Sequence, residues 1–501
     1  MYSRVDNGDY NLNVWTIDWV ARTVPTDPAN LFNANIFHPA TLTLAYSEPL
    51  ILQGVLAMPA VWLGVSPIAT FSLLLIAGLA LSAWAFALLV ERDTGSWIAG
   101  LVAGSAVAFN AHHLVRLVHI QALHLELLPI VFFALDRLLV SGRRRYAVLL
   151  GASLALQATA SMYLLIFTGW AVICAWLARM PEWRHRLGPT TVWTLLAGAT
   201  CALVLLPIIW PYIELARTHG MMRNLKDTQR CAASWSDYLY TGSHVHYQAW
   251  SHHFNNSVDA SFPGVIVTGL AVFGLLGPAG RTPRARMWLA IVLGAVLFSV
   301  LPRLPGFPWL FGHVPGMSAI RCYSRAAQLA LIGLAVLAGY GTAQLLARLT
   351  SARAAIVAGV ALVAAINVEA LRAPLWYREF RGIPSIYDRL RDEPHAVVVE
   401  LPFYDRRTFF GNSGYMLNAI LHRHPIVNGY SGFVPRDFEA TAQSLRTFPS
   451  LTSLETLHKH GVTHVVVHPA LRLKRPEIDA TPSLRLMTEQ GGIAIYRFVA
   501  R

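Results

Sequence analysis

A succession of long apolar segments is the feature that most constrains the fold of this chain. Segments of about 20 residues, long enough to cross a bilayer as helices, run near 67 to 90, 121 to 140, 190 to 212, 325 to 347 and 353 to 372. Shorter apolar segments lie near 97 to 111, 263 to 279 and 286 to 302. Charged residues make up 13% of the chain, well below the roughly 25% of soluble proteins. The sequence therefore predicts a mainly α, polytopic integral membrane protein.

The stretch from 146 to 178 contains no charged residue over 33 positions. A single helix of that length would measure roughly 50 Å, whereas the hydrocarbon core is about 30 Å thick. We therefore expect a helical hairpin that turns near Ser161, Met162 and Tyr163. With this hairpin, the chain is predicted to cross the membrane about ten times.

Arginine clusters in short loops predict the orientation of these helices. The four clusters are Arg143, Arg144 and Arg145; Arg179, Arg184 and Arg186; Arg281, Arg284 and Arg286; and Arg348 with Arg353. Basic loops face the cytoplasm in most membrane proteins, and placing all four clusters there lets the helices alternate. The segments 1 to 66, 111 to 120, 213 to 262, 303 to 324 and 373 to 501 then lie on the extracytoplasmic side.

This topology predicts three parts. Residues 1–66 form an extracytoplasmic loop that ends in an interfacial helix near 50 to 64, because that apolar stretch contains Pro59 and is short for a span. Residues 67–372 form the transmembrane helical domain. Residues 373–501 form a small extracytoplasmic α/β domain, with strands at 395–401, 463–468 and 493–498 and helices at 385–391 and 453–460.

Cysteine spacing and net charge exclude some classes of site and partner. The four cysteines, at 174, 201, 231 and 322, include no CxxC pair, so neither a zinc site nor a disulfide framework is predicted. The net charge of +13 arises partly from the arginines in the short loops. The sequence contains no run of basic residues interleaved with aromatic ones. Nucleic acid is therefore not predicted as a partner.

Acidic residues are concentrated in the polar segment before the first apolar stretch. This segment contains Asp6, Asp9, Asp18, His38 and Glu48 among aromatic residues. Two carboxylates at a membrane boundary can bind a divalent cation or act as a general base. The alternative is a loop with solvated carboxylates and no chemical role.

The motifs GDYNLNVW, NIFHP and YSEPL resemble the GT-C class of membrane glycosyltransferases, in particular a bacterial, largely uncharacterised group. The resemblance implies sugar transfer from a polyprenyl-phosphate carrier, with the early loop aspartate as catalytic base or cation ligand. Asp9 matches that aspartate, and Glu48 matches the ionisable residue before the proline. Both are candidate ligands of a divalent metal cation. The class usually has a transmembrane helix before the aspartate loop, so we expect an apolar stretch of about 20 residues upstream of Met1.

The segment NAHHLVRLVHIQALHLE is rich in histidine and contains one arginine. Arg116 and His119 lie three positions apart, on one face of a helix if the segment is helical. Ionisable groups at the mouth of a membrane helix usually face a cavity, and in the class resembled this loop lines the active site. Arg116 and His119 are therefore candidate substrate ligands, although no aspartate accompanies them here. Interfacial histidines without a role are the alternative, and a metal site is the less favoured one.

Two further segments contain candidate substrate ligands. SWSDYL, in an aromatic loop, could form a lid that carries Asp237. Arg321 and Arg325 lie four positions apart before the apolar segment at 325–347, so their guanidinium groups are expected on one face at a helix N-terminus. That position suits a phosphate group. Interface aromatics and arginines that reach lipid headgroups are the respective alternatives.

The resemblance thus implies an inverting hexosyl or pentosyl transferase in the bacterial inner membrane. Its donor would be a polyprenyl-phosphate-linked sugar, and its extracytoplasmic acceptor a glycan, lipid or protein. Membrane lipids surround its spans. A glycolipid transporter or flippase is the first alternative, disfavoured because the spans carry few charges and show no repeat. A non-catalytic accessory protein of envelope glycan assembly is the second.

Overall fold

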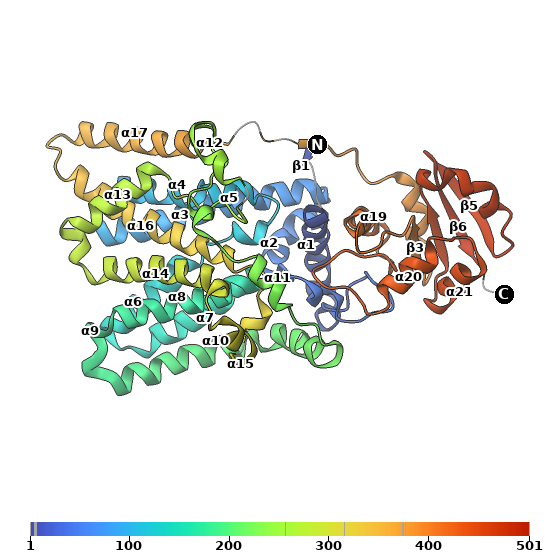
Figure 1. The fold of residues 1–501 in the computed structure, drawn as a ribbon, viewed down its shortest axis with the longest axis horizontal. Coiled ribbons are helices and arrows are strands. Elements are labelled where there is room, and N and C mark those ends of the chain that lie inside the picture. Colours follow the sequence, from blue (N-terminus) through green and yellow to red (C-terminus); the bar gives the residue numbers. More distant parts are fainter. Residues whose placement is uncertain are drawn as a thin grey trace. The chain divides into compact units, whose positions relative to one another are not determined.

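The chain folds into two compact units, which are described separately (Figure 1). The computed structural model describes residues 2–4, 8–255, 257–314, 316–372, 375 and 377–499, so the candidate Asp6 lies outside the described residues. Unit 1 comprises Met1–Leu73, Ile209–Met221 and Trp376–Arg501, and unit 2 comprises Leu74–Ile208 and Met222–Leu375. The predicted domain boundaries at residues 66 and 372 stay a prediction.

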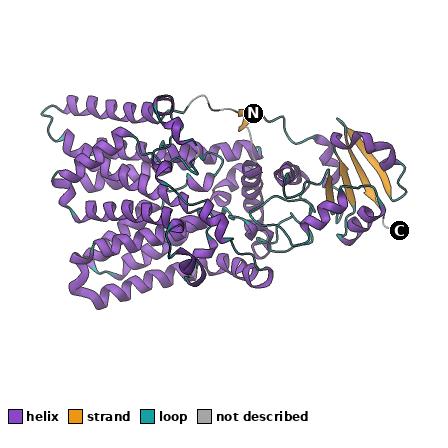
Figure 2. Cartoon of the chain, in the orientation of Figure 1, coloured by secondary structure: helices purple, strands orange, loops and turns teal. Residues whose placement is uncertain are grey.

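Long helices make up most of unit 2 (Figure 2). They are α3 (Pro67–Thr94), α4 (Trp97–Ala108), α6 (Leu128–Ser141), α7 (Arg144–Ala160), α8 (Met162–Ala178), α10 (Leu187–His219), α13 (Val265–Leu276), α14 (Pro283–Val300), α16 (Ala327–Leu346) and α17 (Ala352–Ala370), of which α3 and α10 extend into unit 1. Shorter helices are α5 (Ala111–Val115), α9 (Met180–Trp183), α11 (Leu225–Arg230), α12 (His244–Ala249) and α15 (Phe307–His313). Within the described residues, each of the ten predicted crossings coincides with one long helix. The polytopic α-helical fold is therefore confirmed.

By length and apolar composition, six helical stretches in the described part of the chain can span a membrane, accompanied by shorter apolar helices. Their packing in unit 2 uses small residues as well as large apolar ones. A Cβ added at Gly341 of α16 would lie 1.9 Å from the Leu270 carbonyl oxygen of α13. These two helices therefore approach at a distance that only glycine allows, as is common between membrane helices.

Buried ion pairs join several helix ends at one end of unit 2, here called the ion-pair end. The Arg179 guanidinium, just after α8, donates to Asp136 Oδ1 of α6 at 2.6 Å, and both side chains are almost fully buried. Arg284 of α14 donates to Asp136 Oδ2 at 3.2 Å and lies 3.2 Å from Asp93 of α3. Helix α7 starts close to the end of α6, and α8 ends near the same place, where Arg179 pairs with Asp136 of α6. Helices α7 and α8 therefore run in opposite directions and form the predicted hairpin, with Ser161 between them.

All four predicted arginine clusters lie at this ion-pair end. Arg186 donates to the Val140 carbonyl oxygen at 2.8 Å. This contact lies close to the start of α7, where the cluster Arg143, Arg144 and Arg145 is located. Arg348 stacks over Phe273 near the end of α13, at 4.8 Å from the ring centroid. The opposite end of unit 2, here called the loop end, carries the connections 109–127, 220–264 and 301–326.

Unit 1 contains two N-terminal helices, α1 (Gly8–Thr26) and α2 (Ile51–Trp62), and the C-terminal domain. The elements of that domain are α18 (Asp388–Arg391), β3 (Val398–Leu401), α19 (Asn412–His422), α20 (Phe438–Leu445), α21 (Leu451–Lys459), β4 (His464–Val467), α22 (Arg475–Asp479), β5 (Leu484–Gln490) and β6 (Ile493–Phe498). The sheet order is β3-β4-β6-β5, with β3 and β4 parallel and the other pairs antiparallel. A separate antiparallel pair joins β1 (Tyr2–Arg4) to β2 (Tyr377–Glu379). The predicted small α/β domain is confirmed.

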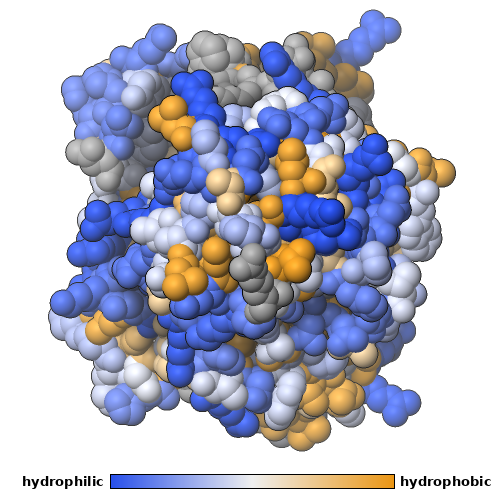
Figure 3. Space-filling view, turned by 90° about the vertical axis from the view of Figure 1, so that its right-hand side faces the viewer, coloured by the Kyte–Doolittle hydropathy of each residue, from blue (hydrophilic) through white to orange (hydrophobic). Residues whose placement is uncertain are grey.

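Exposed apolar residues of unit 1 are found on α2, whereas the surface of the C-terminal domain is mostly polar. α2 packs Gly54 against Val20 of α1, whereas Leu56, Trp62 and Leu63 are exposed. An apolar surface on such a short helix fits the predicted interfacial position. The C-terminal face shown in Figure 3 is mostly hydrophilic, with scattered hydrophobic residues, as is usual for a surface in water.

Two predictions of local structure were wrong, and three elements of the C-terminal domain were not anticipated. Residues 8–26, expected as loop, form helix α1, because Tyr10, Val14, Ile17 and Ala21 recur at helical spacing and are buried. Helix α6 starts at Leu128, so residues 121–127 are not part of a span. In the C-terminal domain β5, α19 and α20 were not expected, because their polar faces hide the apolar pattern.

The ion-pair end predicts a large stability difference between two arginine substitutions. Arg179→Ala leaves Asp136 buried with one partner fewer, which should lower the free energy of unfolding by about 3 kcal/mol. Arg230→Ala removes an exposed pair with Asp227 and should change it by less than about 1 kcal/mol. Thermal unfolding of the purified proteins measures both. Equal effects would contradict the assigned burial.

Candidate functional site

An ion pair between two distant loops lies at the centre of the loop end of unit 2. Arg116, just after α5, donates through Nε to Asp259 Oδ1 at 3.2 Å and through a second guanidinium nitrogen to Oδ2. The side chains are 12% and 2% exposed. Bidentate pairing of this kind fixes both groups in direction as well as in distance. The predicted candidate Arg116 therefore has a fixed carboxylate partner, supplied from 143 residues further along the chain.

Asp237 holds the loop that carries Asp259. Its carboxylate is fully buried and accepts hydrogen bonds from the backbone N–H of Ser234 at 2.7 Å and from the backbone N–H of Asp259. It also accepts from the Ser234 hydroxyl at 2.7 Å. The Asp237 backbone N–H in turn donates to the Ser234 side chain, so the two residues form a capping box over the turn Trp235–Tyr238. The structure thus gives Asp237 a role in positioning Asp259, with its carboxylate oxygens bonded to Ser234 and Asp259.

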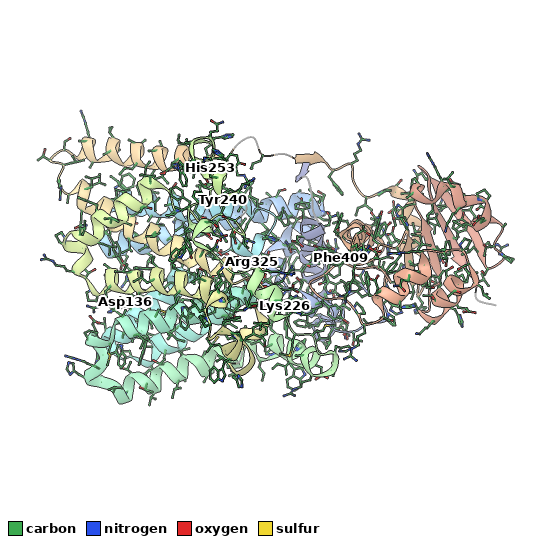
Figure 4. The ribbon with its side chains drawn as sticks, in the orientation of Figure 1. Asp136, Lys226, Tyr240, His253, Arg325 and Phe409 are labelled. Carbon is green, nitrogen blue, oxygen red and sulfur yellow. A yellow bond between two sulfur atoms is a disulfide. The ribbon has the colours of Figure 1, made fainter. Side chains whose placement is uncertain are left out.

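Arg325 lies beside this ion pair, on a 3₁₀ turn (Tyr323–Ala326) that precedes α16. Its guanidinium carbon is 5.1 Å from the centroid of the Tyr163 ring. The preceding residue, Ser324, donates to Asp259 Oδ2 at 3.3 Å. The turn before α16 is therefore attached to the Arg116–Asp259 pair. Figure 4 shows Arg325 at the loop end and Asp136 at the ion-pair end.

The expected helical arrangement of Arg321 and Arg325 was wrong. Helix α16 begins only at Ala327, so Arg321 lies on a bend before it and Arg325 on the 3₁₀ turn. The Arg321 side chain is exposed, while its backbone N–H donates to the Tyr163 hydroxyl at 3.3 Å. Both arginines therefore neighbour Tyr163 without sharing a helix face.

Two histidines complete the group. His112 is fully buried, with Nδ1 3.4 Å from Asp259 Oδ1, and neither ring nitrogen makes a hydrogen bond within the described residues. Arg325 Nε is likewise buried without a hydrogen-bond partner there. Burial lowers the pKa of His119 well below its usual value, and the positive charges of Arg325 and Arg116 add to this effect. His119 is thus a neutral member of the same group.

The charges of this group do not balance. Burial raises the pKa of Asp259, but His112, Arg116 and Arg325 outweigh it and lower that pKa to about 2. The carboxylate is therefore ionised at neutral pH, and two guanidinium groups face one carboxylate. A surplus positive charge and buried polar atoms without partners suit an anionic ligand, because buried polar groups are otherwise nearly always hydrogen-bonded.

The remaining histidines of the 111–124 segment have structural partners. His113 Nε2 lies 2.8 Å from Gln328 Nε2, and His124 Nδ1 lies 2.9 Å from Glu126 Oε1. The segment is helical only to Val115, so the expected spacing along one helix was wrong. The chain turns after α5 and directs His119 toward the arginines and His124 toward α3, where its Nε2 donates to the Leu74 carbonyl oxygen.

A disulfide between Cys231 and Cys322 fixes the same end of unit 2. The absence of disulfides expected from cysteine spacing was therefore wrong, because the two residues are 91 positions apart and meet only in the fold. Cys322 directly precedes the turn that carries Ser324 and Arg325, and the Ser324 N–H donates to the Cys231 carbonyl oxygen at 3.2 Å. The disulfide thus connects the 220–264 loop to the arginine turn.

The other two candidates, Asp9 and Glu48, belong to unit 1. Asp9 lies in the first turn of α1 and accepts a hydrogen bond from the Tyr430 hydroxyl at 2.7 Å. Tyr430 comes from the NGYSGF loop of the C-terminal domain, which therefore packs on α1. Glu48 follows Ser47, whose carbonyl oxygen accepts from the Tyr212 hydroxyl at 2.8 Å. Asp9 thus lies on α1, and Glu48 lies in the chain shortly before α2.

A divalent metal at Asp9 and Glu48 is not supported by the ligand set. Metal ions bound by protein alone usually need three or more side-chain ligands. Among the residues that the structure describes, no group of three or more His, Cys, Asp or Glu side chains could hold a metal ion. The residues present do not fit a protein-ligated metal site, so we assign no chemical step to one.

Comparison with solved structures identifies the fold. Neither a protein-family model nor a curated protein matches the sequence. The archaeal oligosaccharyltransferase AglB from Archaeoglobus fulgidus, in complex with an inhibitory peptide and a dolichol-phosphate, is similar with a TM-score of 0.52 and 11% identity over 98% of this chain and 70% of that one. ArnT from Cupriavidus metallidurans bound to undecaprenyl phosphate is similar with a TM-score of 0.50 and 13% identity over 98% of this chain and 97% of that one.

The chain has the GT-C fold. A structure of an Archaeoglobus fulgidus oligosaccharyltransferase in complex with Zn and sulfate is similar with a TM-score of 0.53 and 11% identity, over 95% of this chain and 65% of that one. A metal is therefore present in a structure with this fold, although the ligand set of the present chain does not indicate one.

Sequence reasoning found Arg116, His119 and Arg325 and missed Asp259 and His112 as their partners. Asp259 lies in the same aromatic loop as Asp237, 22 residues further on, and nothing in its local sequence distinguishes the two. The available signal was chemical: a buried arginine at a helix mouth requires a carboxylate, and the aromatic loop contains three aspartates, Asp227, Asp237 and Asp259.

The thiol state of the protein is the first test of this site. Without reductant, alkylation of the unfolded protein should label Cys174 and Cys201 but not Cys231 or Cys322. Reduction should lower the free energy of unfolding by about 4 kcal/mol, as expected for a bridge across a loop of this length. Peptide mass spectrometry and thermal unfolding measure these outcomes. Labelling of all four cysteines before reduction would contradict the structure.

Proposed function

We propose that this protein is a membrane glycosyltransferase that transfers a sugar from a polyprenyl-phosphate carrier to an extracytoplasmic acceptor. The observation that carries the proposal is the unbalanced positive charge at Arg116, Arg325 and Asp259, in a chain with the GT-C fold. AglB and ArnT have been solved with dolichol-phosphate and undecaprenyl phosphate, respectively. A lipid phosphate is the kind of anion that a positively charged group at the end of a helical membrane domain would meet.

Arg325 is the proposed ligand of the carrier phosphate. Arg116 has its carboxylate partner in Asp259, whereas Arg325 has a buried Nε without a hydrogen-bond partner in the described residues. A guanidinium group can donate two parallel hydrogen bonds to phosphate oxygens. In this arrangement Arg325 contacts the phosphate. Arg116 adds positive charge beside it, and the neutral His119 lies in the same group.

Asp9 is the proposed general base. In an inverting transfer, an acceptor oxygen attacks the anomeric carbon, the bond from that carbon to the phosphate oxygen breaks, and polyprenyl phosphate leaves with the bonding electrons. The proton of the acceptor hydroxyl passes to the base. Tyr430 donates to Asp9 Oδ1, which keeps the carboxylate in one direction for that proton transfer. We assign Glu48 no separate step.

Two independent features support an extracytoplasmic loop end in a bacterial inner membrane. The four arginine clusters lie at the ion-pair end, and clusters of this kind favour the cytoplasmic side. The Cys231–Cys322 disulfide lies at the loop end, and disulfides persist in oxidising compartments. Both features support an extracytoplasmic position for the arginine turn.

Asp9→Asn tests the base. The substitution keeps the shape of the side chain and its contact with Tyr430 but removes the proton acceptor, so the transfer rate should fall about 10²- to 10⁴-fold. Asp27→Asn, at an exposed position just beyond the same helix, is the matched control and should transfer normally. The assay follows a radiolabelled polyprenyl-phosphate sugar in membranes. Unchanged transfer by Asp9→Asn would refute the assignment.

Arg325→Gln tests the phosphate site in a binding experiment that needs no sugar acceptor. Loss of two charge-assisted hydrogen bonds should weaken binding of undecaprenyl phosphate about 10- to 100-fold. Lys226→Gln removes one exposed positive charge at the same end of unit 2 and should leave binding within about twofold. Native mass spectrometry of the purified protein measures both affinities. Equal losses would mean that general charge, rather than a phosphate site, attracts the carrier.

A further inference from the structure

Unit 1 contains a pocket that the proposed transfer site does not use. It has a volume of about 360 Å³, within the range of small-molecule sites in proteins. One wall is the loop Phe37–Ala40, another is the end of α10 with His219, and the third is the start of α20. Phe403, Val427 and Phe438 form a buried apolar floor.

The loop wall is held rigidly against the C-terminal domain. The backbone N–H groups of Phe37 and His38 donate to the carbonyl oxygens of Asn428 and Ile426, both at 3.0 Å. Phe37 has a φ of 58°, a left-handed conformation that is unfavourable for a bulky residue. Its ring is nevertheless fixed, with its centroid 5.7 Å from that of Tyr46 and 5.9 Å from that of Phe438. The pocket is therefore preformed.

The polar groups of the pocket carry both signs of charge. Arg436 and Asp437 are neighbours at the start of α20, and the Asp437 side chain is 54% exposed. His460 is 8% exposed, and its Nδ1 donates to the Thr456 carbonyl oxygen at 2.9 Å, so its Nε2 faces Asp437 at 3.6 Å. Burial lowers the pKa of His38, with a smaller contribution from His460. The pocket thus presents donors and acceptors together.

These features favour some ligand classes over others. Arg436 and Asp437 carry opposite charges side by side, so the pair favours neither an anion nor a cation. A lipid chain would remove His460 and Asp437 from water without replacing their hydrogen bonds, which is costly. A neutral ring with hydroxyl groups on its edge and C–H groups on its face satisfies both the polar groups and the apolar floor.

We propose that this pocket binds one neutral pyranose unit of the acceptor, which is then a glycan. This assignment of the acceptor class rests on the proposed function. The binding step itself involves neither Asp9 nor Arg325, so it can be tested separately from transfer.

The test is saturation-transfer NMR on the full chain in lipid nanodiscs, because maltoside detergents carry sugars of their own. The probes are methyl glycosides of glucose, galactose, mannose and N-acetylglucosamine. The ring protons of at least one glycoside should receive saturation from the wild-type protein. Asp437→Asn should weaken that binding about tenfold or more, because a charged acceptor is lost. Asp388→Asn, an exposed carboxylate of the same domain, should leave it unchanged.

A second variant keeps the proposal testable if Asp437→Asn does not fold. Ala40→Trp fills the pocket from its loop wall without changing any charge, and it should abolish saturation of the same glycoside. Asp9→Asn should retain sugar binding while it loses transfer, which separates failure of this proposal from failure of the proposed function. The proposal is overturned if no glycoside receives saturation, or if both pocket variants bind it as the wild type does.

Discussion

The ion pair between Arg116 and Asp259 is the interaction on which the loop end of unit 2 depends. It joins two loops that are 143 residues apart, and Ser324 attaches the turn before α16 to the same carboxylate. Both charges are largely withdrawn from water, so loss of either partner would leave the other at a cost of about 3–5 kcal/mol. Because both carboxylate oxygens of Asp259 accept hydrogen bonds from Arg116, we propose that the guanidinium group of Arg325 binds an anionic ligand.

Some groups around that pair hold the loops in place, and others have atoms available for a ligand. Asp237 and the Cys231–Cys322 disulfide fix the loop and the turn, while His112 and Arg325 retain buried atoms without hydrogen-bond partners in the described residues. A site of this kind holds its charge in place before the ligand arrives, which reduces the cost of reorganisation on binding. Unit 1 follows the same pattern, with Tyr430 directing Asp9 from the C-terminal domain.

Hydropathy predicted the long helices because a membrane span must satisfy its backbone hydrogen bonds internally. It did not predict where the helices end, and the positions of Arg321, Arg325 and His119 depend on those ends. Helix α1 was missed because Asn13, Thr16 and Asp18 are polar although buried. Asp259 and the disulfide required contacts between distant segments, which spacing within one sequence does not reveal. The fold persists at 11–13% identity with solved structures, so its chemistry must be argued from individual side chains.

The position of the carrier phosphate is the central claim, and an experimental structure of the complex with undecaprenyl phosphate tests it most directly. The phosphate oxygens are predicted to lie about 2.7–2.9 Å from the Arg325 guanidinium nitrogens, with Arg116 still paired to Asp259. A phosphate bound elsewhere, with Arg325 packed only on Tyr163, would contradict the account.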